Sequence, residues 1–248
     1  MTLATFAMMT LCIKAGLWQY NKAHLKQSLQ AQLNARLAEP PSALPNMLMA
    51  DKPLVDKLLV GKLADLENLR YRRVKFTGSY DTNYQVLLDN QVENTVAGYH
   101  VFTLMRVDGS KVYVLINRGW IKGSPDRKPP VVTTPQGRQV IEGDISLPAK
   151  KFFTLEVPSA ESGEWQSILP NQVWQNLDMQ RYTQSVPFAV HPFVVRLDAN
   201  SNAGGFVRNW PAPGNRVNMH LGYAYQWFGF ALTLLVIYFV LNIKKVER

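Results

Sequence analysis

The residue types best suited to chemistry gather in one stretch near the carboxyl end, NMHLGYAYQWFGFA, which spans Asn218–Ala231. On a helix, Tyr223 and Trp227 share the face of His220, three and seven positions further on. Gln226 lies on a different side of the same helix. A neutral imidazole with flat aromatic neighbours can bind a metal or a haem iron. An interfacial histidine bonded to water or lipid headgroups has the same pattern, so both interpretations stay open.

A second candidate is NRGW, Asn117–Trp120, which ends a strand-like run. Gly119 lets the backbone take an unusual angle between Arg118 and Trp120. The functional interpretation is that Arg118 grips a carboxylate, because a guanidinium group can bond both carboxylate oxygens. The structural alternative is that Arg118 stacks on Trp120 and closes a turn. Physical reasoning favours the structural alternative.

Motifs of the familiar enzyme classes are absent from the sequence. There is no GxSxG nucleophile elbow, no GxxxxGK[ST] phosphate loop and no HExxH zinc motif. The 4 histidines show no metal-ligand spacing, and the single cysteine, Cys12, cannot form an internal disulfide. The net charge is +9, but the basic residues are scattered, which argues against a nucleic-acid-binding module. We expect a protein that is not an enzyme and binds no nucleic acid; a membrane-anchored enzyme would need a site assembled from distant residues.

A transmembrane helix is predicted over residues 218–243. From Leu221 to Ile243 no side chain carries a formal charge. At about 1.5 Å per residue, such a helix is long enough to cross about 30 Å of hydrocarbon. Aromatic rings crowd its first turns, where they favour the membrane interface. The basic tail, residues 244–248, follows at once, so the positive-inside rule favours a cytoplasmic carboxyl terminus.

Residues 1–20 predict a first transmembrane helix whose single lysine reaches toward the nearer surface. A cleaved signal peptide is the alternative. It is disfavoured because a basic leading segment and a small-x-small cleavage site are missing. Trp18 and Gln19 stand near the end of this helix. If the two terminal helices pair, these side chains can meet Gln226 and Trp227.

Two terminal spans leave residues 21–217 as one extracytoplasmic domain, with both termini cytoplasmic. Its first part is helical, because leucines recur four apart up to Pro40-Pro41; they are Leu25, Leu29, Leu33 and Leu37. A second helical stretch is predicted over Lys52–Leu69.

From Arg72 the sequence consists of short β-type runs. VDGS between residues 100–106 and 111–118 predicts a hairpin. The expected turns are marked by Gly78, Asp89-Asn90, Asp108-Gly109 and Asn200–Gly205. The fold class that follows is a membrane protein in which two terminal transmembrane helices flank a mainly antiparallel β domain, an α+β partial barrel.

The chain resembles the Surfeit locus protein 1 family of cytochrome c oxidase assembly factors, nearly end to end. GLWQYNKAHLKQSL is similar to the exit of that family's first span. RRVKFTGSYD, YQVLLDN and AGYHVFTLM resemble its early strands, and VLINRGWIKGSPDR resembles its central RGW signature. The most specific match is the carboxyl-terminal block, GFVRNWPAPGNRVNMHLGYAYQWFGFAL.

The resemblance implies a bacterial inner-membrane protein with a periplasmic main domain that assists haem a delivery or insertion into the catalytic subunit of cytochrome c oxidase. Its implied partners are that subunit, haem a synthase and the lipid bilayer. The implied cofactor is transient haem a, with His220 as the candidate ligand beside Tyr223 and Trp227. Residues implied in partner contact or folding are Trp18, Gln19, Arg118, Gly119, Trp120 and Gln226. The alternative is a scaffold that holds the nascent oxidase subunit by helix packing and never touches haem.

Overall fold

The structure, a computed structural model, describes residues 2–44, 66–126, 128–148 and 170–243. The chain divides into two compact units. One is helical and contains Met1–Ala35 and Pro211–Arg248, and the other contains Arg36–Trp210 and carries the sheet. Each unit is described by itself.

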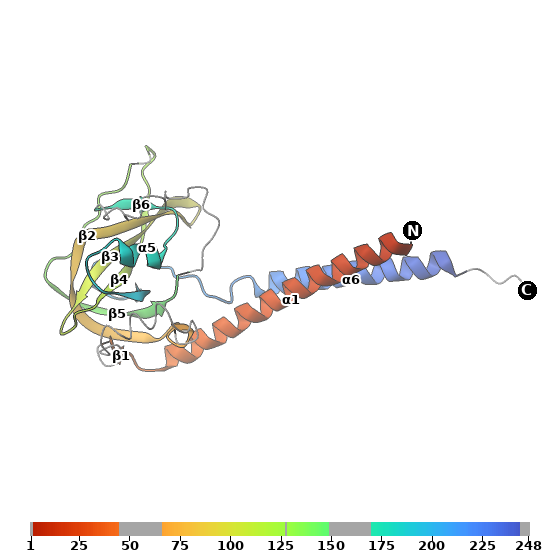
Figure 1. The fold of residues 1–248 in the computed structure, drawn as a ribbon, viewed down its shortest axis with the longest axis horizontal. Helices are drawn as coiled ribbons and strands as arrows, with labels where there is room; N and C mark the ends of the chain where they lie inside the picture. Colours follow the sequence, from red (N-terminus) through yellow and green to blue (C-terminus); the bar gives the residue numbers. More distant parts are fainter. Residues whose placement is uncertain (1, 45–65, 127, 149–169, 244–248) are drawn as a thin grey trace, which may run out of the picture. The chain divides into compact units, whose positions relative to one another are not determined.

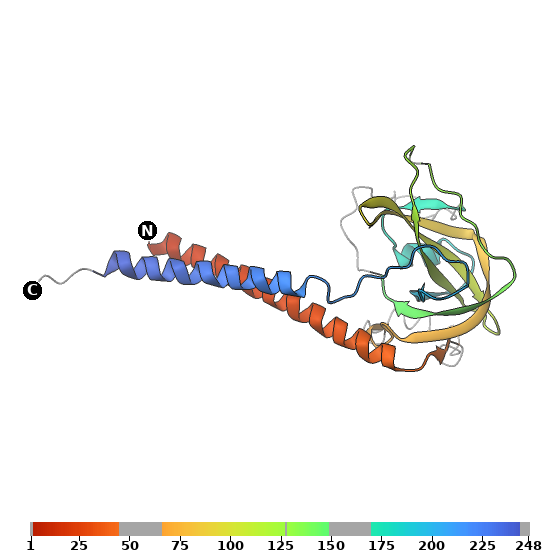
Figure 2. The ribbon, with the colours of Figure 1, turned by 180° about the vertical axis from the view of Figure 1, so that it is seen from behind.

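The helical unit is built from two long helices, α1 (Thr2–Ala38) and α6 (Val217–Asn242), which lie side by side in Figures 1 and 2. They run antiparallel, since the ring of Phe6 near the start of α1 lies 5.5 Å from that of Tyr238 near the end of α6. The predicted helical extension is confirmed: α1 continues without interruption to Ala38 and ends before the two prolines, because a residue that precedes proline avoids the helical conformation.

The buried residues of the helix pair are small: Cys12, Gly16 and Ala23 on α1, and Ala224 and Ala231 on α6. A Cβ atom on Gly16 would lie 2.5 Å from a ring carbon of Phe228, so this position has no room for a larger residue unless that ring moves. Small residues let helix backbones approach closely, which is the common way in which helices pack inside membranes.

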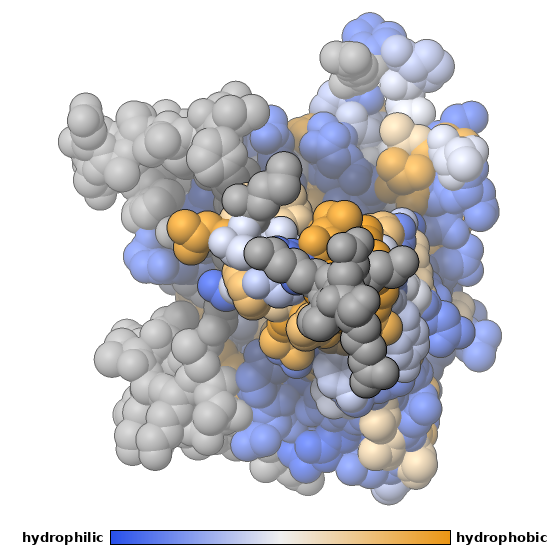
Figure 3. Space-filling model, turned by 90° about the vertical axis from the view of Figure 1, so that its right-hand side faces the viewer, coloured by the Kyte–Doolittle hydropathy of each residue, from blue (hydrophilic) through white to orange (hydrophobic). Residues whose placement is uncertain are grey.

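The outward faces of residues 2–13 of α1 and of most of α6 are apolar, and Figure 3, which faces the end of the pair, shows hydrophobic side chains gathered there. Exposed examples are Leu3, Leu11, Leu232, Val240 and Leu241. Among the described residues, α6 is the one helix long and apolar enough to cross a membrane, which by itself indicates a span only weakly. The helix predicted over residues 1–20 is present within α1; that it crosses a membrane stays a prediction.

The second unit is built on a seven-stranded mixed sheet. Its strands are β1 (Ser42–Ala43), β2 (Arg73–Glu93), β3 (Val96–Val107), β4 (Tyr113–Lys122), β5 (Arg138–Ser146), β6 (Gln172–Trp174) and β7 (Val190–Leu197). The short helix α5 (Met179–Gln184) precedes β7. The Asp178 carboxylate caps this helix by accepting from the backbone N–H groups of Gln180 and Arg181. The helix predicted over Lys52–Leu69 lies almost wholly outside the described residues.

The prediction of a mainly antiparallel sheet is correct only in part. The pairs β2–β3, β3–β4, β2–β5 and β5–β7 are antiparallel, whereas β1–β2, β2–β6 and β4–β7 are parallel. The hairpin predicted around VDGS is confirmed as β3–β4. Because β2 also pairs with β5, the pairings β2–β3–β4–β7–β5–β2 form a closed circuit. The predicted partial barrel stays an interpretation of that circuit.

Two of the predicted turns are wrong, because they lie inside the continuous strand β2. Gly78 pairs with Val107 on one side and Gln139 on the other, and a Cβ atom there would overlap the carbonyl oxygen of Arg106. Asn90 takes a left-handed backbone angle, φ 59°, inside an irregularity in the β2–β3 register. Gly78 therefore allows a close approach of two backbones, and Asn90 lies at an irregularity of the strand. Besides marking turns, such residues commonly occupy these positions within strands.

Strand β4 carries the centre of the sheet unit. It is buried from Val114 to Trp120, because β3 and β7 pair with its two edges and hydrophobic clusters cover its faces. Strands buried on both faces are typically continuous apolar runs. Arg118 interrupts that run and is placed in the interior.

Candidate functional site

His220 and Gln19 form the central contact of the helical unit. His220 lies at the end of the first turn of α6. The residue before this helix, Arg216, has a left-handed backbone angle, φ 67°. The histidine Nδ1 is 2.7 Å from the amide Oε1 of Gln19 on α1. An amide oxygen only accepts hydrogen bonds, so this contact is a hydrogen bond in the form of the ring that carries its proton on Nδ1. The structure thus joins two of the predicted site residues.

Two further polar contacts fix the register of the helices near this pair. The Lys26 ammonium donates to the backbone oxygen of Asn215 at 2.9 Å, and the backbone N–H of Gly214 donates to Gln30 Oε1, also at 2.9 Å. Gln19, Lys26 and Gln30 are seven and four positions apart and share one face of α1. They hold the segment before α6 against that face.

Sequence reasoning missed Lys26 and Gln30, although a signal was present. Positions alternately four and three apart form a heptad-like seam, the spacing expected of two helices packed along their length; the seam is Cys12, Gly16, Gln19, Ala23, Lys26 and Gln30. The leucines that suggested an amphipathic helix do not follow this seam, and Leu25 and Leu37 are each 52% exposed.

The aromatic residues near His220 divide into exposed and half-buried rings. Tyr223 and Trp18 are exposed, at 46% and 61%. The half-buried ring of Trp227 lies against that of Phe230, with centroids 5.8 Å apart. Gln226 has an exposed side chain, and Gln19 pairs with His220 instead of with this amide. Such rings suit both a membrane interface and the face of a porphyrin.

The ligand set of the helical unit suits a haem iron better than a free metal ion. In the described part of the chain, no three histidine, cysteine, aspartate or glutamate side chains gather to hold a metal. A macrocycle supplies its own four nitrogens, so the protein needs to offer only an axial ligand. His220 can offer Nε2, because Nδ1 is engaged by Gln19.

Arg118 forms a second polar cluster, in the sheet unit, and is only 1% exposed. Its guanidinium donates to the backbone oxygens of Gly204 at 2.9 Å and Thr133 at 2.6 Å, and to the Thr134 hydroxyl at 2.7 Å. The rings of Tyr80 and Phe206 lie 5.1 and 5.0 Å from the guanidinium carbon. Burial lowers the pKa of Arg118 below its ordinary value.

Neither sequence interpretation of Arg118 describes this cluster fully. The hydrogen-bond acceptors that the described residues offer to its guanidinium are neutral oxygens, including Gln85 Oε1 and Thr103 Oγ1 at 3.3 Å each. The stacking partners are Tyr80 and Phe206, so the prediction that Arg118 stacks on Trp120 is wrong. Arg118 ties β4 to two loops, which is a structural role.

Gly119 and Trp120 have structural contacts as well. The predicted unusual backbone angle at Gly119 is confirmed, φ 113°, and a Cβ atom there would lie 2.6 Å from the carbonyl oxygen of Val207. Trp120 exchanges backbone hydrogen bonds with Val207, at 2.7 and 3.0 Å. Its indole N–H donates to the Gln91 carbonyl at 3.0 Å. The RGW segment therefore needs glycine at its centre because another chain segment crosses it closely.

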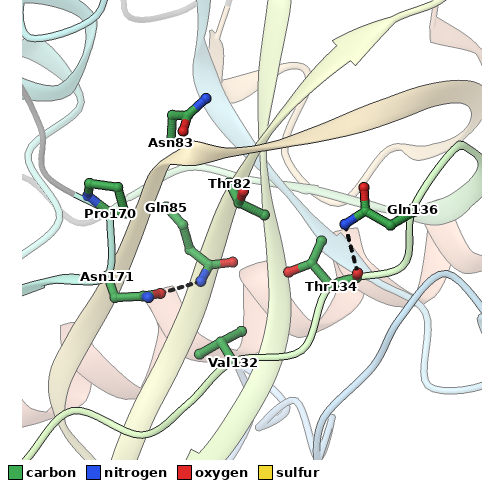
Figure 4. A pocket seen from close by; sticks show the side chains of 8 residues that line it. All are labelled: Thr82, Asn83, Gln85, Val132, Thr134, Gln136, Pro170 and Asn171. Atoms are coloured by element: carbon green, nitrogen blue, oxygen red, sulfur yellow. Dashed lines mark hydrogen bonds between the residues drawn. The ribbon is translucent and has the colours of Figure 1, made fainter.

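A cavity of about 300 Å³ lies beside the Arg118 cluster, and Figure 4 shows the side chains that line it. Gln85 and Thr134 belong both to the lining and to the partners of Arg118. The eight lining residues are Thr82, Asn83, Gln85, Val132, Thr134, Gln136, Pro170 and Asn171. None of these side chains ionises near neutral pH. The cavity can donate and accept hydrogen bonds, and the lining residues that the structure describes include no general acid or base.

The sheet unit holds one buried histidine, His191, and one half-buried histidine, His100. Burial lowers the pKa of His191 to about 4, and this ring stacks on Phe193 with centroids 5.1 Å apart. Among the described residues its Nδ1 has no hydrogen-bond partner. Burial also lowers the pKa of His100 to about 4, although nearby Glu93 acts in the opposite direction. Both imidazoles are therefore neutral at pH 7.

Comparison with known proteins identifies the class. The model of the SURF1 family matches residues 6–232, which include both helices and the sheet. The chain belongs to the SURF1 family. It is 25% identical to a SURF1-like protein of Rickettsia bellii, over 95% of this chain and 87% of that one. It is 28% identical to the cytochrome oxidase assembly protein SHY1 of Saccharomyces cerevisiae, over 73% of this chain and 42% of that one, and 24% identical to Surfeit locus protein 1 of Mus musculus, over 93% and 72%.

Proposed function

We propose that this protein assists the assembly of cytochrome c oxidase in a bacterial inner membrane and carries haem a as transient cargo. Membership of the SURF1 family and the similarity to a yeast cytochrome oxidase assembly protein support the role in assembly. The partners that fit this role are the catalytic subunit of the oxidase, which would receive haem a, and haem a synthase, which would supply it.

The observation that carries the haem part of the proposal is the pairing of His220 with Gln19. The pairing engages Nδ1 and leaves the Nε2 lone pair for an axial bond to iron. Exposed rings nearby, Tyr223 and Trp18, offer flat surfaces to a porphyrin. A single protein ligand suits a carrier, because cargo held by one axial bond can be released to a receiving subunit.

The membrane placement rests on α6 and on the charge of the tail. The outward face of α6 is mostly apolar and carries no charged side chain, and the tail that follows is basic. In our proposal α1 forms a second span, both termini are cytoplasmic and the sheet unit is periplasmic. A green fluorescent protein fused after Arg248 is then fluorescent, and alkaline phosphatase at the same position is inactive; the reverse result would overturn this topology.

The second candidate function is that of a scaffold that binds the nascent oxidase subunit through its helices and takes no cargo. The close packing of small residues between α1 and α6 favours the scaffold function, because the Gln19–His220 bond also stabilises that packing. Substitution of His220 by glutamine separates the two. Glutamine can keep a hydrogen bond to Gln19 but supplies no imidazole, so a scaffold tolerates it and a haem carrier does not.

The direct test is an absorption spectrum of the detergent-purified protein from cells that make haem a. Wild type, His220→Ala and His220→Gln are compared, with His24→Ala as the matched control, since His24 is an exposed histidine on α1. We expect a haem a spectrum in wild type and the control and its loss in both His220 variants. Equal spectra in all four proteins would exclude His220 as an essential ligand, and no haem in any of them would favour the scaffold.

A further inference from the structure

We propose that Gln19 is a positioning residue that holds His220 in the tautomer with the proton on Nδ1, so that Nε2 is the ligating nitrogen. The part of this inference that concerns haem rests on the proposed function. The part that concerns the tautomer does not, because it follows from the contact between the two side chains.

The argument starts from the imidazole ring. A neutral histidine has one protonated nitrogen, and the hydrogen bond made by one nitrogen decides which form is populated. Gln19 directs its carbonyl oxygen at Nδ1 at 2.7 Å, a distance typical of a good hydrogen bond. An acceptor at that position stabilises the form with a proton on Nδ1. The other nitrogen, Nε2, then points away from Gln19 with its lone pair free.

The helix packing explains why Gln19 meets this ring. Ala23 and Ala224 have 0% exposure, so the two backbones are close beside the pair. The contacts of Lys26 with Asn215 and of Gln30 with Gly214 set the register about two and three turns beyond Gln19 along α1. A shift of α1 by one residue would turn Gln19 by about 100° away from the seam. The pair is thus a consequence of the whole seam and not of two flexible side chains.

The consequence for a haem ligand is specific. Because Nε2 carries no proton in this tautomer, it can bind iron without first releasing one. The bond to Gln19 also fixes the plane of the ring, and such supporting partners typically change metal affinity by about 10- to 100-fold when they are removed. Through Gln19, the Trp18-Gln19 pair of α1 is thereby connected to His220 of α6, and neither sequence motif has this role alone.

The test that needs no haem uses ¹⁵N-histidine-labelled full-length protein in detergent at pH 8, where an ordinary imidazole is neutral. The ¹⁵N chemical shifts of His220, identified by their loss in His220→Gln, report which ring nitrogen is protonated. We compare wild type, Gln19→Leu, which removes the acceptor at similar size, Gln19→Glu, which restores an oxygen acceptor, and Gln27→Leu, which changes an exposed glutamine on α1.

We expect a protonated Nδ1 in wild type, Gln19→Glu and Gln27→Leu, and a shift of the proton toward Nε2 in Gln19→Leu. A wild-type spectrum with the proton on Nε2 would overturn the inference. A Gln19→Leu spectrum equal to wild type would overturn it as well. Unchanged circular dichroism of Gln19→Leu identifies the effect as local to the ring.

A second measurement tests the haem part, by titration of haem a into the same purified proteins. We expect the dissociation constant to rise about 10- to 100-fold in Gln19→Leu and to stay near the wild-type value in the other two. Equal affinities in wild type and Gln19→Leu would refute the positioning role toward haem. Absence of binding to wild type, with the expected ¹⁵N shifts, would refute the cargo function and the ligand role while the tautomer assignment stands.

Discussion

Replacement of His191 by leucine is expected to stabilise the protein, although His191 is buried in strand β7. Its side chain is 3% exposed, and within the described part of the chain its Nδ1 has no partner. A buried polar group left unpaired costs about 1–3 kcal/mol. Leucine has a similar volume and no polar atom, so at pH 7.5 we expect the free energy of unfolding to rise by an amount in that range.

The same substitution should weaken the dependence of stability on pH. The folded-state pKa of His191 is about 4, below the ordinary value of about 6.5. As the pH falls, the unfolded chain therefore binds a proton at His191 before the folded protein does. The free energy of unfolding is therefore highest above about pH 6.5 and falls as the pH is lowered from there toward 4. Between pH 7.5 and 5.5 the loss is about 1.4 kcal/mol for this histidine, and His100 adds a loss of similar size.

The assay is urea unfolding of the full-length protein in detergent, followed by tryptophan fluorescence at pH 7.5 and 5.5. Wild type, His191→Leu and the control His24→Ala are compared; the control changes an exposed histidine and should follow wild type at both pH values. In His191→Leu the loss between the two pH values should fall by about half, because His100 remains. A His191→Leu protein less stable than wild type at pH 7.5, or one with an unchanged pH effect, would refute this reasoning.

Three other predictions concern close packing. Arg118→Lys should lower the free energy of unfolding by about 2–5 kcal/mol in urea unfolding, because an ammonium group cannot reach all the neutral acceptors of the guanidinium; an unchanged midpoint would contradict the role of Arg118 in joining β4 to two loops. Gly16→Leu should destabilise the helix pair by about 1–3 kcal/mol in thermal unfolding, and Phe228→Ala in the same chain should recover part of the loss; additive losses would argue against the contact. Gly119→Ala should cost about 1–3 kcal/mol, through its backbone angle and the nearby Val207 carbonyl, and a midpoint equal to wild type would show that this approach can relax.

Features encoded by neighbouring residues could be predicted from the sequence. The end of α1 before Pro40, the hairpin β3–β4 and the left-handed Gly119 each depend on a few adjacent residues. The β-type runs predicted from Arg72 onward include the strands β5 and β7, whose β-branched residues favour a pleated, half-buried surface.

Features that join distant segments could not be predicted in the same way. Gly78 was predicted to mark a turn, but a residue without a side chain is suited both to a turn and to a strand that another strand approaches closely. Only the position of the neighbouring strand distinguishes the two cases. The parallel pairing of β4 with β7 leaves no local pattern that distinguishes it from an antiparallel one. The residues of the candidate site were predicted one by one, without their contacts. The partner of Gln19 depends on the register of the two helices, which the heptad-like seam encodes but single motifs do not.

The separation of Gln19 and His220 along the chain, 201 residues, has a consequence for biosynthesis. At about 5–20 residues per second, the ribosome needs roughly 10–40 s after making one before it makes the other. Throughout that interval the emerging α1 lacks its partner helix, and the Gln19 amide lacks the imidazole that it contacts in the complete chain. Any chain that terminates before α6 lacks the imidazole altogether. The pair is therefore completed only on finished polypeptides, so translation itself withholds the site from incomplete products.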